Sequence, residues 1–256
     1  MEKKFDNYDI LGIPISAVTP HIASKILLDW SRDKTGRYVG VREVASLMSM
    51  RESEELLDIS RNAAMNLPDG MPLVWIGKHR GYNVERTCGP DFMQKIISEH
   101  EFNQLTHFFY GGKPGVAKDL KDNFEKKYPG VRVVGTISPP FRELTSKEEN
   151  EVIRQINKTK ADVVWVGISS PKQDIWMFRN HTKTHATMIG VGAAFDFHSG
   201  QIKRAPKWMQ HYGLEWLHRL KSEPRRLWKR YLVLAPKFIF QIAKQKFNSS
   251  RQNTND

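Results

Sequence analysis

Two motifs in the first hundred residues carry charged side chains whose types and positions could do chemistry. Asp69 stands between a proline and a glycine in LPDGMPLVW, just before a helical pattern. Such an aspartate caps the following helix or, at the edge of a site, takes a proton from a hydroxyl as a general base, and the motif alone leaves both roles open. Arg86, in ERTCGPDFM, carries a guanidinium that can bind a diphosphate through two hydrogen bonds, although a lone arginine is also common on surfaces.

A glycine-rich segment supplies a second kind of candidate. In HFFYGGKPGVA, Gly111, Gly112 and Lys113 follow an apolar run and precede a helical pattern. The backbone N–H groups of such a loop can approach a phosphate closely, because glycine has no side chain in the way. A tight structural turn would use the same residues, so both interpretations stay open.

The segment IGVGAAFDFHSG ends another apolar run and then presents two polar side chains. Gly190 and Gly192 close the run, and Asp196 could contact a ribose or a base. Asp196 and His198 are two residues apart, which invites a metal interpretation. We expect no metal site, because no third ligand has a suitable spacing and the chain contains neither an Asp-x-Asp motif nor more than one cysteine.

A third segment, GISSPKQDIWM, leaves an apolar run through a Ser-Ser-Pro turn. Lys172 and Gln173 in this segment can hydrogen-bond to a sugar or a phosphate without a metal ion. The turn is equally explained as an ordinary entry into a helix.

These candidates are held by apolar runs that alternate with helical patterns from residue 104 onwards. We expect strands at 106–110, 131–137, 161–167 and 187–192 and helices at 114–127, 146–160 and 171–181. A capping box from Ser146 to Glu149 is expected to open the second of these helices. Short strands between helices predict right-handed βαβ units, a parallel sheet and an α/β fold. Ligands of such sheets bind beyond the carboxyl ends of the strands, where the loops at Gly111, Ser169 and Gly192 lie.

The rest of the chain is expected to complete this domain and add a C-terminal appendage. Helical patterns at 20–33, 52–65 and 71–80 are expected to belong to elements that join the same sheet. We expect residues 1–201 to form the α/β domain, residues 202–247 a helical appendage, and residues 248–256 a disordered polar tail.

The positive charge of the protein is concentrated in the appendage. The net charge is +12, and residues 202–246 hold twelve Lys and Arg against two Glu, which gives that segment +10. Pro206, Pro224 and Pro236 are each expected to open a short helix. Basic side chains interleaved with Trp, Tyr and Phe suit an anionic lipid surface, a nucleic acid, or docking on the domain, and all three stay open here.

The sequence also indicates a compartment. No apolar stretch is long enough for a membrane-spanning helix, and the first residues do not resemble a signal peptide. A single cysteine suits a reducing compartment, so we expect a cytoplasmic protein.

Taken in order, the motifs resemble the WecG/TagA/CpsF glycosyltransferases of bacterial cell-surface polymer synthesis. The resemblance runs from about residue 36 to 240. It rests on Pro68-Asp69-Gly70, Arg86 with Gly89-x-Asp91, FFYGGKPGVA, Pro171-Lys172-Gln173-Asp174, GVGAAFDFHSG, KRAPKW, GLEWLHRL and EPRRLWKRY. Each motif alone is weak evidence for this family, but their occurrence in this order is specific to it.

The resemblance implies a Rossmann-like α/β transferase that inverts the anomeric carbon and needs no cofactor or metal. The implied donor is a UDP-sugar, such as one carrying an N-acetylmannosamine-like sugar. The implied acceptor is a sugar linked to polyprenyl diphosphate at the inner face of the plasma membrane, where the protein would be peripheral.

The same resemblance assigns roles to residues. By position, it implies Asp69 as general base and Gln173 as a catalytic contact to the sugar or acceptor. Donor or diphosphate contacts are implied for Arg86, Gly111, Gly112, Lys113, Gly190, Gly192 and, on the uridine side, Asp196. Acceptor or membrane contacts are implied for Arg204, Arg219, Arg225, Arg226 and Arg230.

One departure and two alternatives accompany this interpretation. The chain has Arg42 and Glu43 where the family usually shows Thr and Asn nearby, and we expect the pocket beside Asp69 to change. The main alternative is a nucleic-acid-binding protein that grips phosphates with its basic appendage. An oxidoreductase ranks last because the glycines lack the G-x-G-x-x-G order. A homo-oligomer is also left open, since the appendage could pack on a second subunit.

Overall fold

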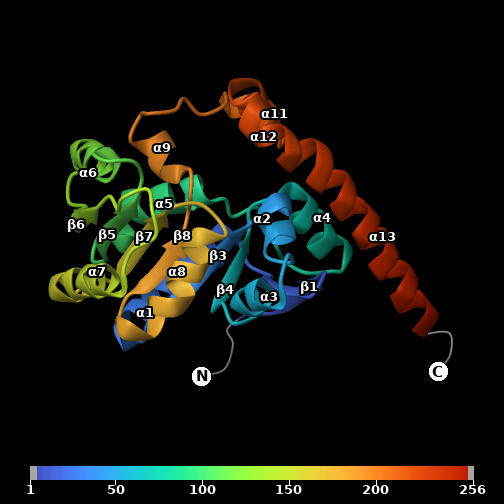
Figure 1. The fold of residues 1–256 in the computed structure, drawn as a ribbon, viewed down its shortest axis with the longest axis horizontal. Helices are drawn as coiled ribbons and strands as arrows, with labels where there is room; N and C mark the ends of the chain where they lie inside the picture. The colour runs from blue at the N-terminus through green and yellow to red at the C-terminus, as the bar shows by residue number, and fades with distance from the viewer. Residues whose placement is uncertain (1–4, 253–256) are drawn as a thin grey trace.

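The core of the protein is a six-stranded parallel sheet, flanked by helices (Figure 1). The structure, a computed structural model, describes residues 5–252, except for the side chains of His211, Arg226, Arg230 and residues 246–252. The strand order is β4-β3-β8-β7-β5-β6, with β3 (Arg37–Arg42), β4 (Met65–Pro68), β5 (Thr106–Gly111), β6 (Arg132–Ile137), β7 (Val163–Gly167) and β8 (Thr187–Gly190). The expected Rossmann-like α/β fold is therefore confirmed.

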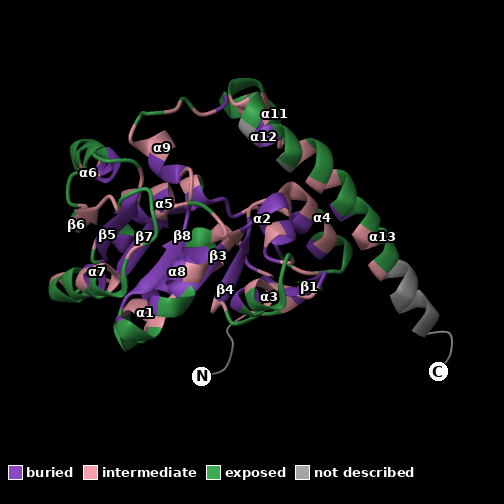
Figure 2. Ribbon diagram, in the orientation of Figure 1, coloured by how far each residue is buried: buried purple, intermediate pink, exposed green. Residues whose placement is uncertain are grey.

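Each face of the sheet has its own hydrophobic core. One face is covered by α1 (Pro20–Asp33), α5 (Gly89–Ser98), α6 (Val116–Lys127) and the short α9 (Ala194–His198). The other is covered by α2 (Val44–Ser49), α3 (Glu54–Arg61), α4 (Met71–His79), α7 (Ser146–Thr159) and α8 (Lys172–Asn180). Successive residues of β7 alternate between the two cores, as the pleat of a strand requires, and Figure 2 shows the central strands largely buried, whereas the edge strand β6 is only partly buried.

The N-terminal region differs in part from the sequence-based expectation. A hairpin of β1 (Asn7–Ile10) and β2 (Ile13–Ser16) precedes α1. The helix expected over 52–65 ends at Arg61, and Met65–Pro68 forms the edge strand β4. This prediction was wrong because the apolar run before Pro68 fits a helix as well as a strand, and pairing with β3 decides the outcome. The expected capping box is also displaced by one residue, to Thr145 and Glu148.

The C-terminal region contains fewer separate helices than expected at its end. After α10 (Lys207–His211) and α11 (Glu215–Ser222), the chain is continuously helical through α12 (Pro224–Trp228), a π-helical turn (Lys229–Val233) and α13 (Leu234–Gln252). Pro236 therefore lies inside a helix and does not open one. A proline lacks the N–H for the usual bond to the preceding turn, and a wider π turn directly before it accommodates that loss.

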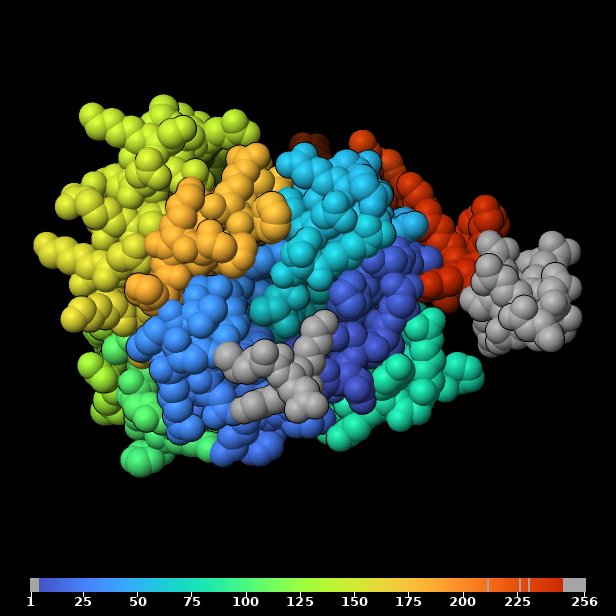
Figure 3. Space-filling view, turned by 90° about the horizontal axis from the view of Figure 1, so that it is seen from below, coloured from blue at the N-terminus to red at the C-terminus, as the bar shows by residue number. Residues whose placement is uncertain are grey.

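The long C-terminal helix packs against the domain along its middle. Phe238 is buried in the core beneath α2, and Gln245 Nε2 donates a hydrogen bond to Asp9 Oδ1 at 2.8 Å. Figure 3, viewed from below, shows this helix beside the N-terminal hairpin. Residues 248–252 of the expected disordered tail belong to α13, and 253–256 lie outside the described residues. Within the described part of the chain, no helix is both long and apolar enough to cross a membrane.

Candidate active site

Asp69 lies at the carboxyl end of β4, where the strand turns into α4. Its backbone N–H donates to the Arg42 carbonyl at 2.8 Å, and the N-cap of α4 is the next residue, Gly70, without a side-chain cap bond. The cap role for Asp69 is therefore wrong. Its carboxylate instead pairs with Arg86, with 3.2 Å between Oδ1 and Nη2, and its side chain remains 22% exposed.

Arg86 is the centre of a network that joins the domain to the appendage. Its Nε donates to the Asp69 carbonyl at 2.8 Å, and its Nη2 also lies 3.3 Å from Oε2 of Glu215 in α11. Glu215 is buried and accepts a 2.7 Å hydrogen bond from Nε of Arg204. Arg204 in turn pairs with Asp91, so carboxylates and guanidinium groups alternate along the network. The appendage thus covers Arg86 with a carboxylate.

This environment changes the acidity of Asp69. The pKa of the Asp69 carboxyl is raised to about 6, mainly by burial; the charge of Arg86 opposes this rise, and the nearby charges of Glu43 and Glu215 add to it. A carboxyl with a pKa in this range can both accept a proton near neutral pH and hold it well enough to act as a base.

Gln173 lies in the first turn of α8, on the sheet face that α8 covers. Its side chain is buried, and a Cβ on Gly190 would come within 2.7 Å of its Nε2. A Cβ on Gly192, which has φ of 50°, would lie 3.7 Å from its Oε1. Among the described residues, Oε1 has no hydrogen-bond partner. Gly190 therefore makes room for the Gln173 amide, whereas a side chain at Gly192 would be disfavoured by its positive φ and not by the amide.

The Gly111-Gly112 turn has a packing reason of its own. Gly111 has φ of 144°, and a Cβ there would lie 2.6 Å from the Gly167 carbonyl group, whose oxygen accepts from Gly112 N at 3.0 Å. The turn must therefore be free of side chains whether or not it binds a phosphate. Lys113 follows it with an exposed side chain. The phosphate role of these three residues stays a prediction.

Asp196 and His198 lie on the short helix α9. His198 Nε2 is 2.9 Å from the Pro90 carbonyl oxygen, and its ring packs on Phe124. These contacts tie His198 to the neighbouring helices α5 and α6. Among the described residues, no three His, Cys, Asp or Glu side chains are grouped so that they could hold a metal ion. Asp196 is half-buried, and its role on the uridine side stays a prediction.

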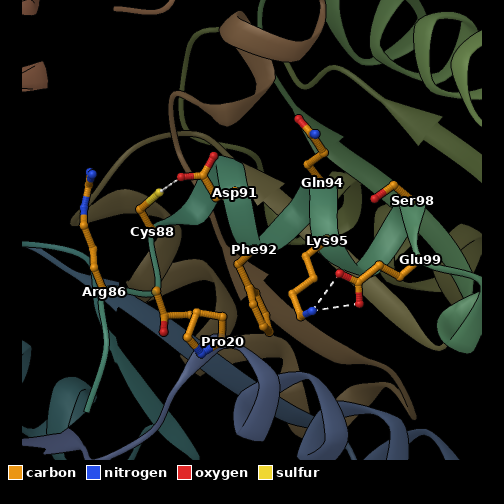
Figure 4. Close-up of a pocket in the computed structure, with 10 residues that line it drawn as sticks. Pro20, Arg86, Cys88, Asp91, Phe92, Gln94, Lys95, Ser98 and Glu99 are labelled. Atoms are coloured by element: carbon orange, nitrogen blue, oxygen red, sulfur yellow. Dashed lines mark hydrogen bonds and ion pairs between the residues drawn. The ribbon is translucent and has the colours of Figure 1, made fainter. Parts of the chain in front are cut away.

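A cavity of about 330 Å³ borders Arg86 on the side of α5 (Figure 4). Arg86 lies at one end, beside the hydrogen bond from Cys88 to Asp91, and the Lys95–Glu99 ion pair lies at the other. Its walls offer hydrogen-bonding groups of both kinds, which suits a polar ligand portion.

The model of the glycosyl transferase WecG/TagA/CpsF family matches residues 8–252. The chain belongs to this family.

Relatives in the family carry more specific names. The N-acetylglucosaminyldiphosphoundecaprenol N-acetyl-beta-D-mannosaminyltransferase of Bacillus subtilis is 28% identical over 199 residues, which cover 77% of this chain and 75% of the relative. The protein of the same name from Bacillus spizizenii is 28% identical over 187 residues, covering 72% and 70%. The resemblance inferred from the motifs is thus confirmed, and the protein is a glycosyltransferase.

The appendage arginines of this glycosyltransferase have different surroundings. Arg204 lies in the Asp69–Arg86 network, and the Arg219 guanidinium carbon lies 5.7 Å from the centre of the Phe197 ring. Arg225 is exposed, whereas the side chains of Arg226 and Arg230 lie outside the described residues. The structure thus brings Arg204 to the site and leaves Arg225 facing solvent.

The departure at Arg42 and Glu43 affects the site in an unexpected way. The Arg42 side chain is fully buried, so it does not line the pocket beside Asp69. Glu43 is the N-cap of α2, accepting from Ser46 N at 2.8 Å, and acts on Asp69 through its charge.

Sequence reasoning missed Glu215 as a site residue. A signal was present in the sequence. The segment 202–246 contains twelve basic residues but only two acidic ones, and Glu215 is one of these two. An acidic residue within so basic a segment indicates an ion pair with a specific cationic side chain.

Proposed function

We propose that this glycosyltransferase transfers a sugar from a UDP-sugar to a sugar linked to polyprenyl diphosphate, with inversion at the anomeric carbon. The named relatives, whose names give a diphosphoundecaprenol-linked acceptor and an N-acetylmannosaminyl group, support this substrate class. The product would serve bacterial cell-surface polymer synthesis. The observation that carries the proposal is the Asp69 carboxylate, held beside Arg86 at the carboxyl edge of the sheet with a raised pKa.

The proposed reaction is a single displacement. Asp69 accepts the proton of an acceptor hydroxyl while the hydroxyl oxygen bonds to the anomeric carbon of the donor. The bond from that carbon to the UDP oxygen breaks on the opposite face, and the electron pair leaves with UDP. Arg86 would stabilise the negative charge on the leaving diphosphate, which requires Glu215 to share or release the guanidinium.

The remaining predicted contacts belong to the donor side. Gln173 would hydrogen-bond to the sugar or the acceptor through its unpartnered Oε1, which requires this buried amide to become accessible. The turn at Gly111, Gly112 and Lys113 and the glycines at 190 and 192 would approach the diphosphate of UDP with their backbone N–H groups, and Asp196 would lie on the uridine side.

We propose further that the protein acts at the cytoplasmic face of the plasma membrane, bound through its appendage. Large apolar side chains are exposed along it, at Trp208, Tyr212, Trp216, Leu217, Trp228, Leu232, Val233, Ile239 and Phe240. Basic residues such as Lys229 and Lys237 lie between them. Exposed apolar side chains beside cationic ones favour the interface of an anionic bilayer.

The test is UDP release by the purified chain. A panel of UDP-sugars would be offered with a short-chain polyprenyl-diphosphate-linked N-acetylglucosamine, with and without a metal chelator. We expect release that depends on the acceptor, persists with the chelator and yields the inverted anomer by NMR. Release without acceptor, or silence across the panel, would contradict the proposed reaction.

A further inference from the structure

A fully buried ion pair lies behind the proposed site. Both side chains of Arg42 and Asp174 are 0% exposed, and Arg42 Nη1 donates to Asp174 Oδ1 at 2.7 Å. Arg42 Nε donates to Asn66 Oδ1 at 2.8 Å, and Ser170 Oγ donates to Asp174 Oδ2 at 2.6 Å. Because charges buried this deeply are costly, such a pair is weak evidence for stability and invites a search for a specific role.

The sheet is shaped to admit this pair beside Gln173. A Cβ on Gly40 would come within 2.3 Å of Arg42 Nη2, so only glycine leaves room for the guanidinium. Gly40 pairs in register with Gly190, the glycine on which the Gln173 amide lies. The guanidinium and the amide therefore rest on neighbouring glycines of β3 and β8.

Arg42 is bonded to both halves of the proposed site. Its backbone carbonyl accepts from the N–H groups of Asp69 at 2.8 Å and Gly70 at 3.3 Å. Its side chain holds Asp174, the residue next to Gln173 in the first turn of α8. One residue thus fixes the Asp69 turn through its backbone and the Gln173 turn through its side chain.

We propose that Arg42 is a positioning residue for sugar transfer, which sets the separation of Asp69 and Gln173 by clamping Asp174. The proposal rests on the proposed function of these two residues. Arg42 touches no substrate. Its contribution is to keep the base and the amide in one geometry, where a displacement of about 1 Å can reduce turnover about 100-fold.

The experiment compares two replacements of Arg42 with a matched control. Arg42→Lys keeps the charge but cannot hold Asp174 and Asn66 together. The double variant Arg42→Met with Asp174→Leu removes both charges and leaves no buried ion unpaired. The control is Arg37→Lys, at the amino end of the same strand, where Arg37 pairs with Asp33 through two hydrogen bonds of 2.6 Å. For each full-length variant, kcat, KM for the donor and thermal unfolding are measured with the UDP-sugar that the wild type uses.

We expect kcat to fall roughly 10- to 100-fold in both Arg42 variants, with KM for the donor nearly unchanged, while Arg37→Lys keeps wild-type kcat. The double variant is expected to unfold near the wild-type temperature, which separates positioning from stability. Wild-type kcat in a folded Arg42 variant would overturn the inference, as would failure of both variants to fold. If the wild type releases no UDP, the proposed function and this inference are both overturned. If the wild type and the Arg42 variants are equally active, only the inference is overturned.

Discussion

The α/β domain and the appendage differ in which side chains they bury and which they expose. At the carboxyl edge of the sheet the domain buries charged groups, with Arg42 and Asp174 fully enclosed. On the appendage, apolar side chains face outward, with Ile239 68% and Phe240 70% exposed. Buried paired charges hold a fixed geometry, and an exposed apolar surface is typical of a binding face, so the contrast agrees with the proposed division into a catalytic and a membrane-binding region.

Two of the contacts between these regions differ in kind. Glu215 joins the appendage to Arg86 at the site, and Phe238 is buried in the core beneath α2. The first contact is polar and close to the proposed reaction, whereas the second is apolar and remote from it. The apolar contact helps to anchor the appendage, and the polar contact brings its charge close to Asp69.

The largest expected effect comes from the domain. Asp69→Asn removes the proposed base, and we expect kcat to fall about 10²- to 10⁴-fold, because that is the usual contribution of a positioned base. Donor binding, measured by calorimetry, should change little. The matched control is Asp58→Asn on the exposed face of α3, which should retain activity. Wild-type turnover by Asp69→Asn would remove the base assignment.

The second-largest expected effect is on vesicle binding by the appendage and does not concern the rate of sugar transfer. Ile239→Ser with Phe240→Ser should reduce binding to phosphatidylglycerol-containing vesicles at least about tenfold, because two side chains lose their burial in lipid. These point changes are sharper than a truncation at residue 224, which would also remove the buried Phe238. Phe141→Ser is the control, since Phe141 is 98% exposed on the loop after β6, away from the appendage. Equal vesicle binding by all three proteins would contradict the membrane role.

The smallest effect tests the contact between the regions. Asp69 acts as a base only when deprotonated, so kcat/KM should fall about tenfold per pH unit below about pH 6 and level off above it. Glu215→Gln removes a negative charge that raises the pKa of Asp69, so the acid limb should move to lower pH, by less than about one unit. Glu151→Gln, on the exposed face of α7, should leave the limb in place. An unmoved limb in Glu215→Gln would show that the appendage does not act on Asp69 through its charge.

Much of the sheet could be predicted from local pattern. The strands β5 to β8 are apolar runs bounded by glycine or by capped helices, and a parallel sheet buries such runs on both faces. The strand β4 escaped prediction because it is short and its first residue, Met65, ends the helical pattern expected over 52–65, so that pairing with β3 decides its conformation. Pro236 misled for the opposite reason, since a local helix-breaking signal was overridden by the π turn before it.

The candidate site also has a part that the sequence indicates and a part that depends on the complete fold. Asp69 and Arg86 are 17 residues apart and lie in motifs that a sequence comparison can recognise, and the structure brings them together. The pairs Arg42–Asp174 and Arg86–Glu215 join segments more than a hundred residues apart. Nothing in the local sequence of Arg42 indicates burial, because its partner is supplied by another strand–helix unit. Contacts of this kind depend on the completed fold.

The position of β8 sets the order in which the protein can become active during synthesis. β8 lies between β3 and β7, and Val39 pairs with Ile189. A nascent chain that has already made Asp69 and Arg86 still lacks the strand that joins the first two strands to the rest of the sheet. The pairing of β3 with β8 joins residues that are far apart in the sequence, and such contacts form slowly. The sheet can therefore close only after residue 190 has been made, and a chain interrupted before β8 would leave the edges of β3 and β7 unpaired, which favours aggregation.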